Sequence, residues 1–347
     1  MIHLFTKTLG AVALFAALLP MASAQTAGAA ANNNANANTN ANANAAAWSP
    51  TKPITLIVPV PPGSSTDMLA RLLAERLPAT LGQTVIVTNR PGASGMIGAA
   101  SVARAEPDGY TLLLSPSTLL GAPHVLPKGA GSGVDVVNDL TVIVKTASSP
   151  LVILAHPSLG VKTPRELAAY AKAHPGLPYA SSGSGSPQHI AGQLFSKATR
   201  TELTHVPYKG VMPAVMDTVG GQIKLVFSAL GGVTQYIDGG QLVAIAVTEK
   251  ARSSLLPNVP TLTESGIPGV ELNVFFPVMA PAKTPAPVLA RLNREINAVM
   301  RSPDVKEKMR AAGVETLGST VEDAQREVRE EYQRYGQVVA EFNIKAD

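Results

Sequence analysis

The stretch ITLIVPVPPGSSTDMLARLLAERL, residues Ile54 to Leu77, contains the pattern that decides the predicted fold. It begins as an apolar strand, passes through a loop of Pro, Gly and small hydroxyl residues, and continues as an amphipathic helix. The apolar stripe of this helix consists of Leu69, Leu72, Leu73 and Leu77. The pattern predicts a strand–loop–helix unit whose helix buries one side.

The start of this helix is unusually polar, with Ser64, Ser65, Thr66 and Asp67 in a row after Gly63. Such residues cap the unpaired N–H groups of a helix N-terminus. The same N–H groups and the positive end of the helix dipole also suit an anionic ligand. The loop is therefore either an anion-binding site or an ordinary capped connection. For Asp67, we favour helix capping over a role as a general base.

The N-terminus has the layout of an export signal. An apolar run over residues 9–19 is followed by Ala22-Ser23-Ala24, the small-residue pattern of a cleavage site. We predict a signal peptide over residues 1–24, cut before Gln25. Residues 25–47 are almost entirely Ala and Asn, which predicts a disordered tether with no core of its own.

Composition excludes several classes of function. The chain of 347 residues contains no Cys, so it has no disulfide and no thiolate metal site. The formal net charge of +4 is spread along the sequence, without the basic stripe that nucleic acid or an anionic membrane would require. No segment after the signal is apolar enough to be transmembrane. Without disulfides, the stability of an exported protein of this kind must come from its hydrophobic core.

Strands and helices alternate along the remaining chain in two sets. Further strands are predicted at TVIVTNR and TLLLS, and a second set starts with LVILAHP at Leu151, whereas residues 116–133 show no clear periodicity. The last sixty or so residues are mostly helical, over 287–301, 304–312 and 322–342. This predicts an α/β protein of two lobes with a cleft between them. Ligands in such folds bind at the carboxyl ends of strands, here the ends near Val60, Ser115, Ser181 and Ser228.

A second Gly- and Ser-rich loop, SSGSGSPQH over residues 181–189, also joins a strand to a helix. Two helix N-termini facing each other across a cleft could hold both ends of a dianion. The alternative is a flexible linker, which the position between a strand and a helix disfavours. His189 either directs a ring N–H at a ligand or caps its own helix.

Other motifs carry less information. GASGMIG, residues 92–98, has G-x-x-G-x-x-G spacing instead of the dinucleotide fingerprint, so we favour a structural turn. Tyr208 and Lys209 could contact a ligand or brace a lobe, and we favour bracing. No nucleophile motif and no metal-ligand spacing is present, so a hydrolase using Ser65, His189 and Asp67 is disfavoured.

Several motifs, in order, resemble the extracytoplasmic substrate-binding proteins of tripartite tricarboxylate transporters, the Bug family, from Trp48 to Asp347. The matching segments are KPITLIVPVPPGSSTD, NRPGASGMIGA, EPDGYTLLL, SGSGSPQH, HVPYKG, LVAIAVT, NVPTLTESGIPG and APAKTP. The resemblance implies a two-lobe, type II periplasmic-binding-protein fold, located in the periplasm, that closes on a small carboxylate. We assign residues 48–149 and 273–347 to lobe 1 and residues 150–272 to lobe 2.

The resemblance also implies a site and partners. The partners are a small carboxylate and the large and small integral-membrane subunits of the transporter, with the binding protein a monomer that uses no metal, cofactor or catalytic residue. The first loop and the second-lobe loop carry the binding residues, and the other strand ends complete the site. The candidate ligand-binding residues are Val60, Pro61, Gly63, Ser64, Ser65, Thr66, Asp67, Ser115, Ser117, Ser182, Gly183, Ser184, Gly185, Ser186, His189 and Ser228.

Three departures from the usual family pattern bear on the ligand. Ser64 replaces a glycine, Ser228-Ala229-Leu230 replaces a segment that commonly carries Asp or Asn, and Phe275-Phe276-Pro277 replaces an aromatic residue followed by Gly. Fewer polar groups and more apolar bulk favour a di- or aromatic carboxylate without an amino group. A protein with the same fold that signals to a membrane two-component kinase is the alternative, and the sequence does not separate the two.

Overall fold

The computed structural model describes residues 48–127, 133–341 and 343–345. The elements described below all belong to one unit, Ala47–Asp347. The predicted signal peptide, residues 1–24, and the tether, residues 25–47, lie outside the described residues. Among the described residues, none of the helices combines the length and the apolar character needed to span a bilayer.

The first lobe starts as predicted. Strand β1, Ile54–Val58, leads into helix α2, Ser65–Arg76, and the predicted leucine stripe is buried. Helix α3, Pro78–Leu81, connects to strand β2, Val85–Asn89, and a 3-10 turn, η1 at Ala93–Gly95, leads into helix α4, Met96–Ala103. Strand β3, Thr111–Leu114, completes a parallel set in which β1 lies between β2 and β3.

Helix α5, Thr118–Val125, lies in the passage for which the sequence shows no periodicity. Six of its eight residues are buried, so it presents no polar face from which a helical period could be read. Pro123 also lies inside it, and proline normally argues against a helix interior. The absence of a sequence signal therefore reflects burial.

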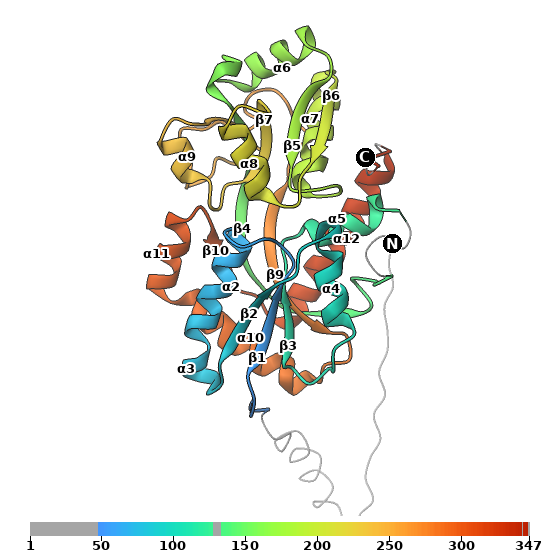
Figure 1. Cartoon of the computed structure of the whole chain (residues 1–347), viewed down its shortest axis with the longest axis vertical. Helices are drawn as coiled ribbons and strands as arrows, with labels where there is room; N and C mark the ends of the chain where they lie inside the picture. The colour runs from blue at the N-terminus through green and yellow to red at the C-terminus, as the bar shows by residue number, and fades with distance from the viewer. Residues whose placement is uncertain (1–47, 128–132, 342, 346–347) are drawn as a thin grey trace, which may run out of the picture. The chain divides into compact units, whose positions relative to one another are not determined.

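Strand β4, Leu140–Ala155, is longer than predicted, because the predicted strand begins only at Leu151. Residues 140–150 pair with strand β9, Asn273–Pro281, and residues 151–155 pair with strands β7 and β8. The pairing with β9 contains two register shifts. Such bulges break the alternation of inward and outward side chains on which strand prediction depends. Strand β4 thus belongs to both lobes (Figure 1).

The second lobe follows the predicted order closely. The 3-10 turn η2, Pro157–Leu159, precedes helix α6, Pro164–Ala173, which starts with a capping box of Thr163 and Glu166. The remaining elements are β5 Leu177–Ser181, α7 Pro187–Thr199, β6 Leu203–Pro207, α8 Val211–Val219, β7 Leu225–Ala229, α9 Thr234–Asp238 and β8 Val243–Val247. Strand β5 runs parallel to β6 and β7.

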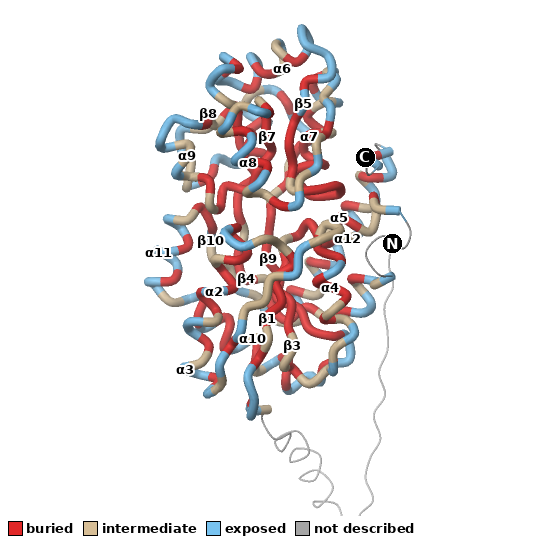
Figure 2. Tube along the Cα trace, viewed as in Figure 1, coloured by how far each residue is buried: buried red, intermediate tan, exposed pale blue. Residues whose placement is uncertain are grey.

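The chain then returns to the first lobe through β9. Helices α10, Ala286–Arg301, and α12, Val321–Glu341, pack on β4, with helix α11, Pro303–Ala311, and the short strand β10, Glu315–Thr316, between them. The strand order β2-β1-β3-β9-β4-β7-β5-β6 makes one continuous sheet. Figure 2 shows the central strands buried and the outer helix faces exposed, whereas the edge strands β2 and β6 are only partly buried. The lobe boundaries at residues 149/150 and 272/273 stay a prediction.

Candidate ligand-binding site

A cavity of about 220 Å³ lies where the loops that follow β1, β2, β3, β5 and β6 converge. These loops all leave the carboxyl ends of their strands, the expected place for a ligand in a parallel sheet. The lining residues are Pro59, Val60, Ser64, Ser65, Thr66, Gly92, Ala93, Ser94, Gly95, Pro116, Thr118, Leu126, Ser182, Gly183, Ser184, Gln188, Pro207, Tyr208, Lys209, Gly210, Val211, Ala229, Val274 and Phe276. Both lobes therefore contribute to the cavity wall.

The first loop is fixed by the start of helix α2. Ser64 is the N-cap: its Oγ accepts a hydrogen bond from the Asp67 amide (3.3 Å) and donates one to the Pro61 carbonyl (3.4 Å). Ser65 and Thr66, which follow, line the cavity. Capping by Ser64 leaves their amides, the first two of the helix, free for another acceptor.

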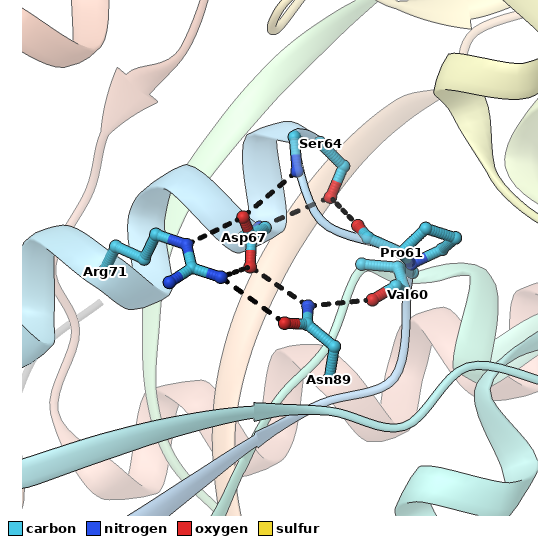
Figure 3. Close-up of polar contacts among 7 residues, drawn as sticks. Val60, Pro61, Ser64, Asp67, Arg71 and Asn89 are labelled. Atoms are coloured by element: carbon cyan, nitrogen blue, oxygen red, sulfur yellow. Dashed lines mark hydrogen bonds and ion pairs between the residues drawn. The ribbon is translucent and has the colours of Figure 1, made fainter.

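Asp67 braces this loop from behind (Figure 3). Its carboxylate accepts hydrogen bonds from the Gly63 amide (3.0 Å), from Arg71 Nε (3.0 Å) and Nη2 (3.2 Å), and from Asn89 Nδ2 (3.0 Å). Asn89 Nδ2 also donates to the Val60 carbonyl at 3.0 Å. Asp67 does not line the cavity, which agrees with the structural role favoured from the sequence.

The charge state of Asp67 follows from these contacts. Burial alone raises the pKa of this carboxyl, but hydrogen bonds from Arg71, Gly63 and Asn89 outweigh burial and hold the pKa below its usual value. Asp67 is therefore ionised at neutral pH and already paired. It is poorly suited to act as a general base.

The second loop, between β5 and α7, is held by hydroxyls and imidazoles. Ser186 is the N-cap of α7, and its Oγ accepts from the His189 amide at 3.1 Å. The amide of Gly185 donates to His189 Nδ1 at 3.2 Å. Ser181 Oγ lies 2.6 Å from His205 Nε2 and accepts from the Gly183 amide at 3.1 Å.

His189 is part of this support and does not line the cavity. It is almost fully buried, and its ring stacks on that of His205 with centroids 3.6 Å apart and an interplanar angle of 6°. The sequence left two roles open, a ring N–H directed at a ligand or a cap on its own helix. The N-cap of α7 is Ser186, and the His189 ring instead supports the loop by accepting from the Gly185 amide. Burial lowers the pKa of His205 to about 4, so this imidazole is neutral under ordinary conditions.

Several backbone amides on the described cavity wall have no acceptor. Within the described part of the chain, no hydrogen bond is made by the amides of Ser65, Thr66, Ala93, Ser94, Thr118, Ser184, Gln188 or Val211. Most lie in the first turns of helices α2, α5, α7 and α8, whose N-termini carry partial positive charge. Such an arrangement can hold an anion without an arginine.

The ionisable groups on the cavity wall also favour an anionic ligand. Among the described residues that line the cavity, Lys209 is the one Lys or Arg, and none is Asp or Glu. Lys209 forms no ion pair with a described residue. Its neighbour Tyr208 donates from its hydroxyl to Asp217 Oδ2 at 2.8 Å. Burial and this contact raise the pKa of Tyr208 to about 12. Tyr208 therefore braces the lobe and also lines the cavity. Lys209, for which we also predict bracing, lines the cavity and has no ion-pair partner among the described residues.

One side of the cavity is apolar. Val60, Leu126, Val274, Phe276 and Ala229 contribute to it, together with Pro59 and Pro116. The amide-rich side and the apolar side together can accommodate a small anion with a hydrocarbon body.

The structure brings some of the sequence-predicted residues to the cavity and places others behind it. Val60, Ser64, Ser65, Thr66, Ser182, Gly183 and Ser184 line the wall. The remaining nine do not line it: Pro61, Gly63, Asp67, Ser115, Ser117, Gly185, Ser186, His189 and Ser228. Gly63, Asp67, Gly185, Ser186 and His189 support the two loops through the hydrogen bonds described above.

Three serines that were predicted to line the site from strand ends lie behind the cavity wall: Ser115, Ser117 and Ser228. Ser228 is fully buried in β7, and its neighbour Ala229 faces the cavity instead, because successive side chains of a strand point to opposite faces. Ser115 is fully buried, with its Oγ bonded to the Pro116 carbonyl. Ser117 Oγ accepts from the Phe275 amide at 3.4 Å.

Sequence reasoning missed the turn Gly92–Gly95, Thr118, Gln188, Gly210 and Val211. It also favoured bracing over ligand contact for Tyr208 and Lys209, both of which line the cavity. The interpretation of GASGMIG as only a structural turn was incomplete, because four of its residues line the cavity. The signal that could have found it was its position, since it follows a parallel strand at the carboxyl end like the other two loops.

The chain is similar to known proteins of one family. The family described as "Tripartite tricarboxylate transporter family receptor" matches residues 69–344. Protein BugT of Bordetella pertussis is 37% identical over 299 residues, covering 85% of this chain and 91% of BugT. A solved R. palustris protein with adipate is 34% identical, with a TM-score of 0.81 over 85% of this chain and 99% of that protein.

A second solved structure, MatC from Rhodopseudomonas palustris with bound malate, is 28% identical, with a TM-score of 0.78 over 84% of this chain and 99% of MatC. The two lobes and the cleft between them are those of a periplasmic binding protein. The chain belongs to the receptor family of the tripartite tricarboxylate transporters, whose members bind solutes and are not enzymes.

Proposed function

We propose that the protein captures a small carboxylate and delivers it to the large and small membrane subunits of a tripartite tricarboxylate transporter. The observation that carries the proposal is the group of free amides on the cavity wall, contributed by both lobes. A carboxylate oxygen accepts such N–H donors directly. No Asp or Glu among the described lining residues would repel it.

We propose a di- or aromatic carboxylate without an amino group as the ligand. The cavity of about 220 Å³ is smaller than the roughly 300–1,000 Å³ of drug-sized sites, which supports a small metabolite. The apolar wall supports a hydrocarbon body, and Lys209 offers a partner for a second carboxylate. An ammonium group on the ligand would find no carboxylate on the described wall. Adipate and malate in the two solved relatives are consistent with a dicarboxylate.

We propose that the mature protein acts as a monomer in the periplasm after removal of residues 1–24. The sequence pattern supports this export. Intact mass measurement of the protein recovered from the periplasm tests it, because a mature chain should begin at Gln25. A mass corresponding to the full chain would contradict it.

Titration calorimetry with purified protein tests the ligand class. The panel contains adipate, malate, benzoate and aspartate, with hexanoate as a monocarboxylate matched in length to adipate. We expect a Kd of about 10⁻⁸ to 10⁻⁵ M for at least one dicarboxylate or aromatic carboxylate, and weaker binding of aspartate. Preference for aspartate would contradict the proposed class, and no binding across a broad carboxylate panel would contradict the function.

Delivery to a transporter is tested in cells. Deletion of the gene should abolish uptake of the radiolabelled ligand and leave ligand-dependent gene induction unchanged. The opposite result would show that the protein serves a membrane sensor kinase.

A further inference from the structure

The turn Gly92–Gly95 has an unusual backbone. All four residues have positive φ, with values of 128° for Gly92, 46° for Ala93, 52° for Ser94 and 95° for Gly95. Ala93 and Ser94 are two of only four non-glycine residues with positive φ in the described part of the chain. This conformation is unfavourable for L-amino acids with a Cβ. Two such residues in succession need compensating contacts.

Ser94 makes such a contact with the other lobe. Its Oγ donates a hydrogen bond to the carbonyl of Ser184 at 2.9 Å, between residues 90 positions apart. Ser94 belongs to the turn after β2 in lobe 1, and Ser184 belongs to the loop after β5 in lobe 2. Both residues line the cavity, so this hydrogen bond joins its two walls.

The lobes also approach each other closely beside this hydrogen bond. A Cβ on Gly183 would lie 3.1 Å from Ser94 Oγ, and a Cβ on Gly121 of helix α5 would lie 1.9 Å from the Gly185 carbonyl oxygen. Glycine at these positions therefore permits backbone and side chain to touch across the cleft. The Ser94 hydroxyl thus lies in a region where the two lobes are in close contact.

The hydrogen bond fixes one peptide group of the second loop at both ends. The carbonyl of Ser184 is held by Ser94 Oγ, while the amide of Gly185, in the same peptide, is held by His189 Nδ1. A carbonyl oxygen that is already hydrogen-bonded presents less negative charge to a carboxylate in the same cavity. The Ser184 amide stays free for the ligand.

We propose that Ser94 is a positioning residue for ligand capture, whose hydroxyl ties the two lobes together and stabilises the closed cavity before the ligand arrives. This inference rests on the proposed function for its effect on affinity. If the closed form is only partly populated in the free protein, the apparent Kd is the intrinsic Kd divided by that fraction. Loss of the Ser94 hydrogen bond then weakens binding by lowering the closed population.

The test compares Ser94→Ala and Ser94→Gly with wild type. Ala removes the hydroxyl and keeps the backbone strain, whereas Gly removes both, so an effect shared by the two variants belongs to the hydroxyl. Ser101→Ala is the matched control, because Ser101 Oγ bonds to the Gly98 carbonyl at 2.7 Å within α4 and does not line the cavity. Asn tolerates positive φ and carries a donor, so Ser94→Asn is the rescue variant.

Two measurements are made on each full-length protein. Stopped-flow and calorimetric titration with adipate give kon, koff and Kd. The distance between spin labels, in the presence and absence of adipate, gives the closed population. The chain has no natural Cys, so labels can be attached at Lys172→Cys in α6 and Lys306→Cys in α11, both exposed.

Both hydroxyl-deleted variants should lower the closed population without adipate and raise Kd by about 2- to 10-fold, the range for one neutral hydrogen bond. Because the fraction of protein competent to bind falls, the change should appear mainly in kon, and Ser94→Asn should recover part of it. Unchanged closed populations in Ser94→Ala and Ser94→Gly would overturn the inference. If wild type binds no carboxylate in the panel but the closed population still falls in these variants, the proposed function fails and the lobe-tying role of Ser94 stands.

Discussion

The two loops that face each other across the cavity look alike in sequence and differ in what holds them. The loop after β1 is braced by an ion pair and an amide, through Asp67, Arg71 and Asn89. The loop after β5 is braced by neutral groups, through the stacked imidazoles of His189 and His205 and the hydroxyls of Ser181 and Ser186. Similar sets of free amides can thus be built on charged or on neutral supports. The two supports should respond differently to pH and to substitution.

Acid should weaken the second loop first. His205 has a pKa near 4 in the fold, against an ordinary value of 6.5. As the pH falls from 6.5 to 4, the unfolded chain takes up a proton that the native protein does not, so stability is lost across this window. Urea unfolding should show a loss of about 3 kcal/mol from this residue. His205→Gln should flatten the pH dependence, and an equal slope in both proteins would refute the assignment.

The first loop should be broken by Asp67→Asn. The amide would face the donors of Gly63, Arg71 and Asn89, which now have a charged acceptor. We expect a loss of about 2–3 kcal/mol in the free energy of unfolding, together with weaker ligand binding. Asp323→Asn is the control, because Asp323 pairs with Arg326 in an exposed position, where solvent screens the pair and its contribution to stability is small. Equal losses in the two variants would show that the buried brace has no special role.

The stabilising contribution of wild-type Asp67 is lost over a different pH range from that of His205. Its pKa lies below the ordinary value of 3.8, so its contribution is present above that value and is lost only as the pH falls through the lower, native pKa. The charged support should therefore persist at pH values at which the neutral imidazole support has begun to fail.

Contact with the opposite lobe distinguishes the loops further. Gly121→Ala adds a Cβ that would lie 1.9 Å from the Gly185 carbonyl oxygen. We expect Kd to rise at least about 10-fold, roughly 1.4 kcal/mol, while helix α5 gains up to about 1 kcal/mol from the better helix former. Calorimetry and thermal unfolding together separate these effects. Gly220→Ala, whose nearest added contact is 3.4 Å away, should leave Kd unchanged.

The smallest effect is expected from Lys209→Gln. If Lys209 pairs with a second carboxylate in a solvated position, its loss should weaken adipate binding by about 2- to 5-fold and leave hexanoate binding unchanged. Added salt should reduce this difference. Lys172→Gln, an exposed lysine on α6, is the control. Equal weakening of adipate and hexanoate binding would show that Lys209 does not interact with the second carboxylate of adipate.

Local signals explain what the sequence predicts well. The polar start and the leucine stripe of α2 both lie within a few helical turns, and this helix begins where expected. The two Gly- and Ser-rich loops face a shared cavity because of their positions after parallel strands. These features depend on neighbours in the chain.

Features that depend on distant partners were missed or misplaced. The first part of β4 was not predicted because bulges interrupt its alternation of side chains. These bulges arise from its pairing with β9, more than a hundred residues away. The choice between Ser228 and Ala229 depends on strand register, in which a shift of one residue exchanges the faces. The positive φ of Ala93 and Ser94 is not encoded by residue types that prefer it, so the contribution of that turn to the cavity was not predicted.

The continuity of strand β4 has a consequence for how the receptor moves. Its sixteen residues run from one lobe into the other, and β9 begins beside Pro150, where β4 changes partners. Any rotation of one lobe relative to the other must therefore flex the same short piece of pleated backbone. The direction of opening is then a property of that backbone, and substitutions in the surrounding loops can alter how often the protein opens without altering the axis about which it turns.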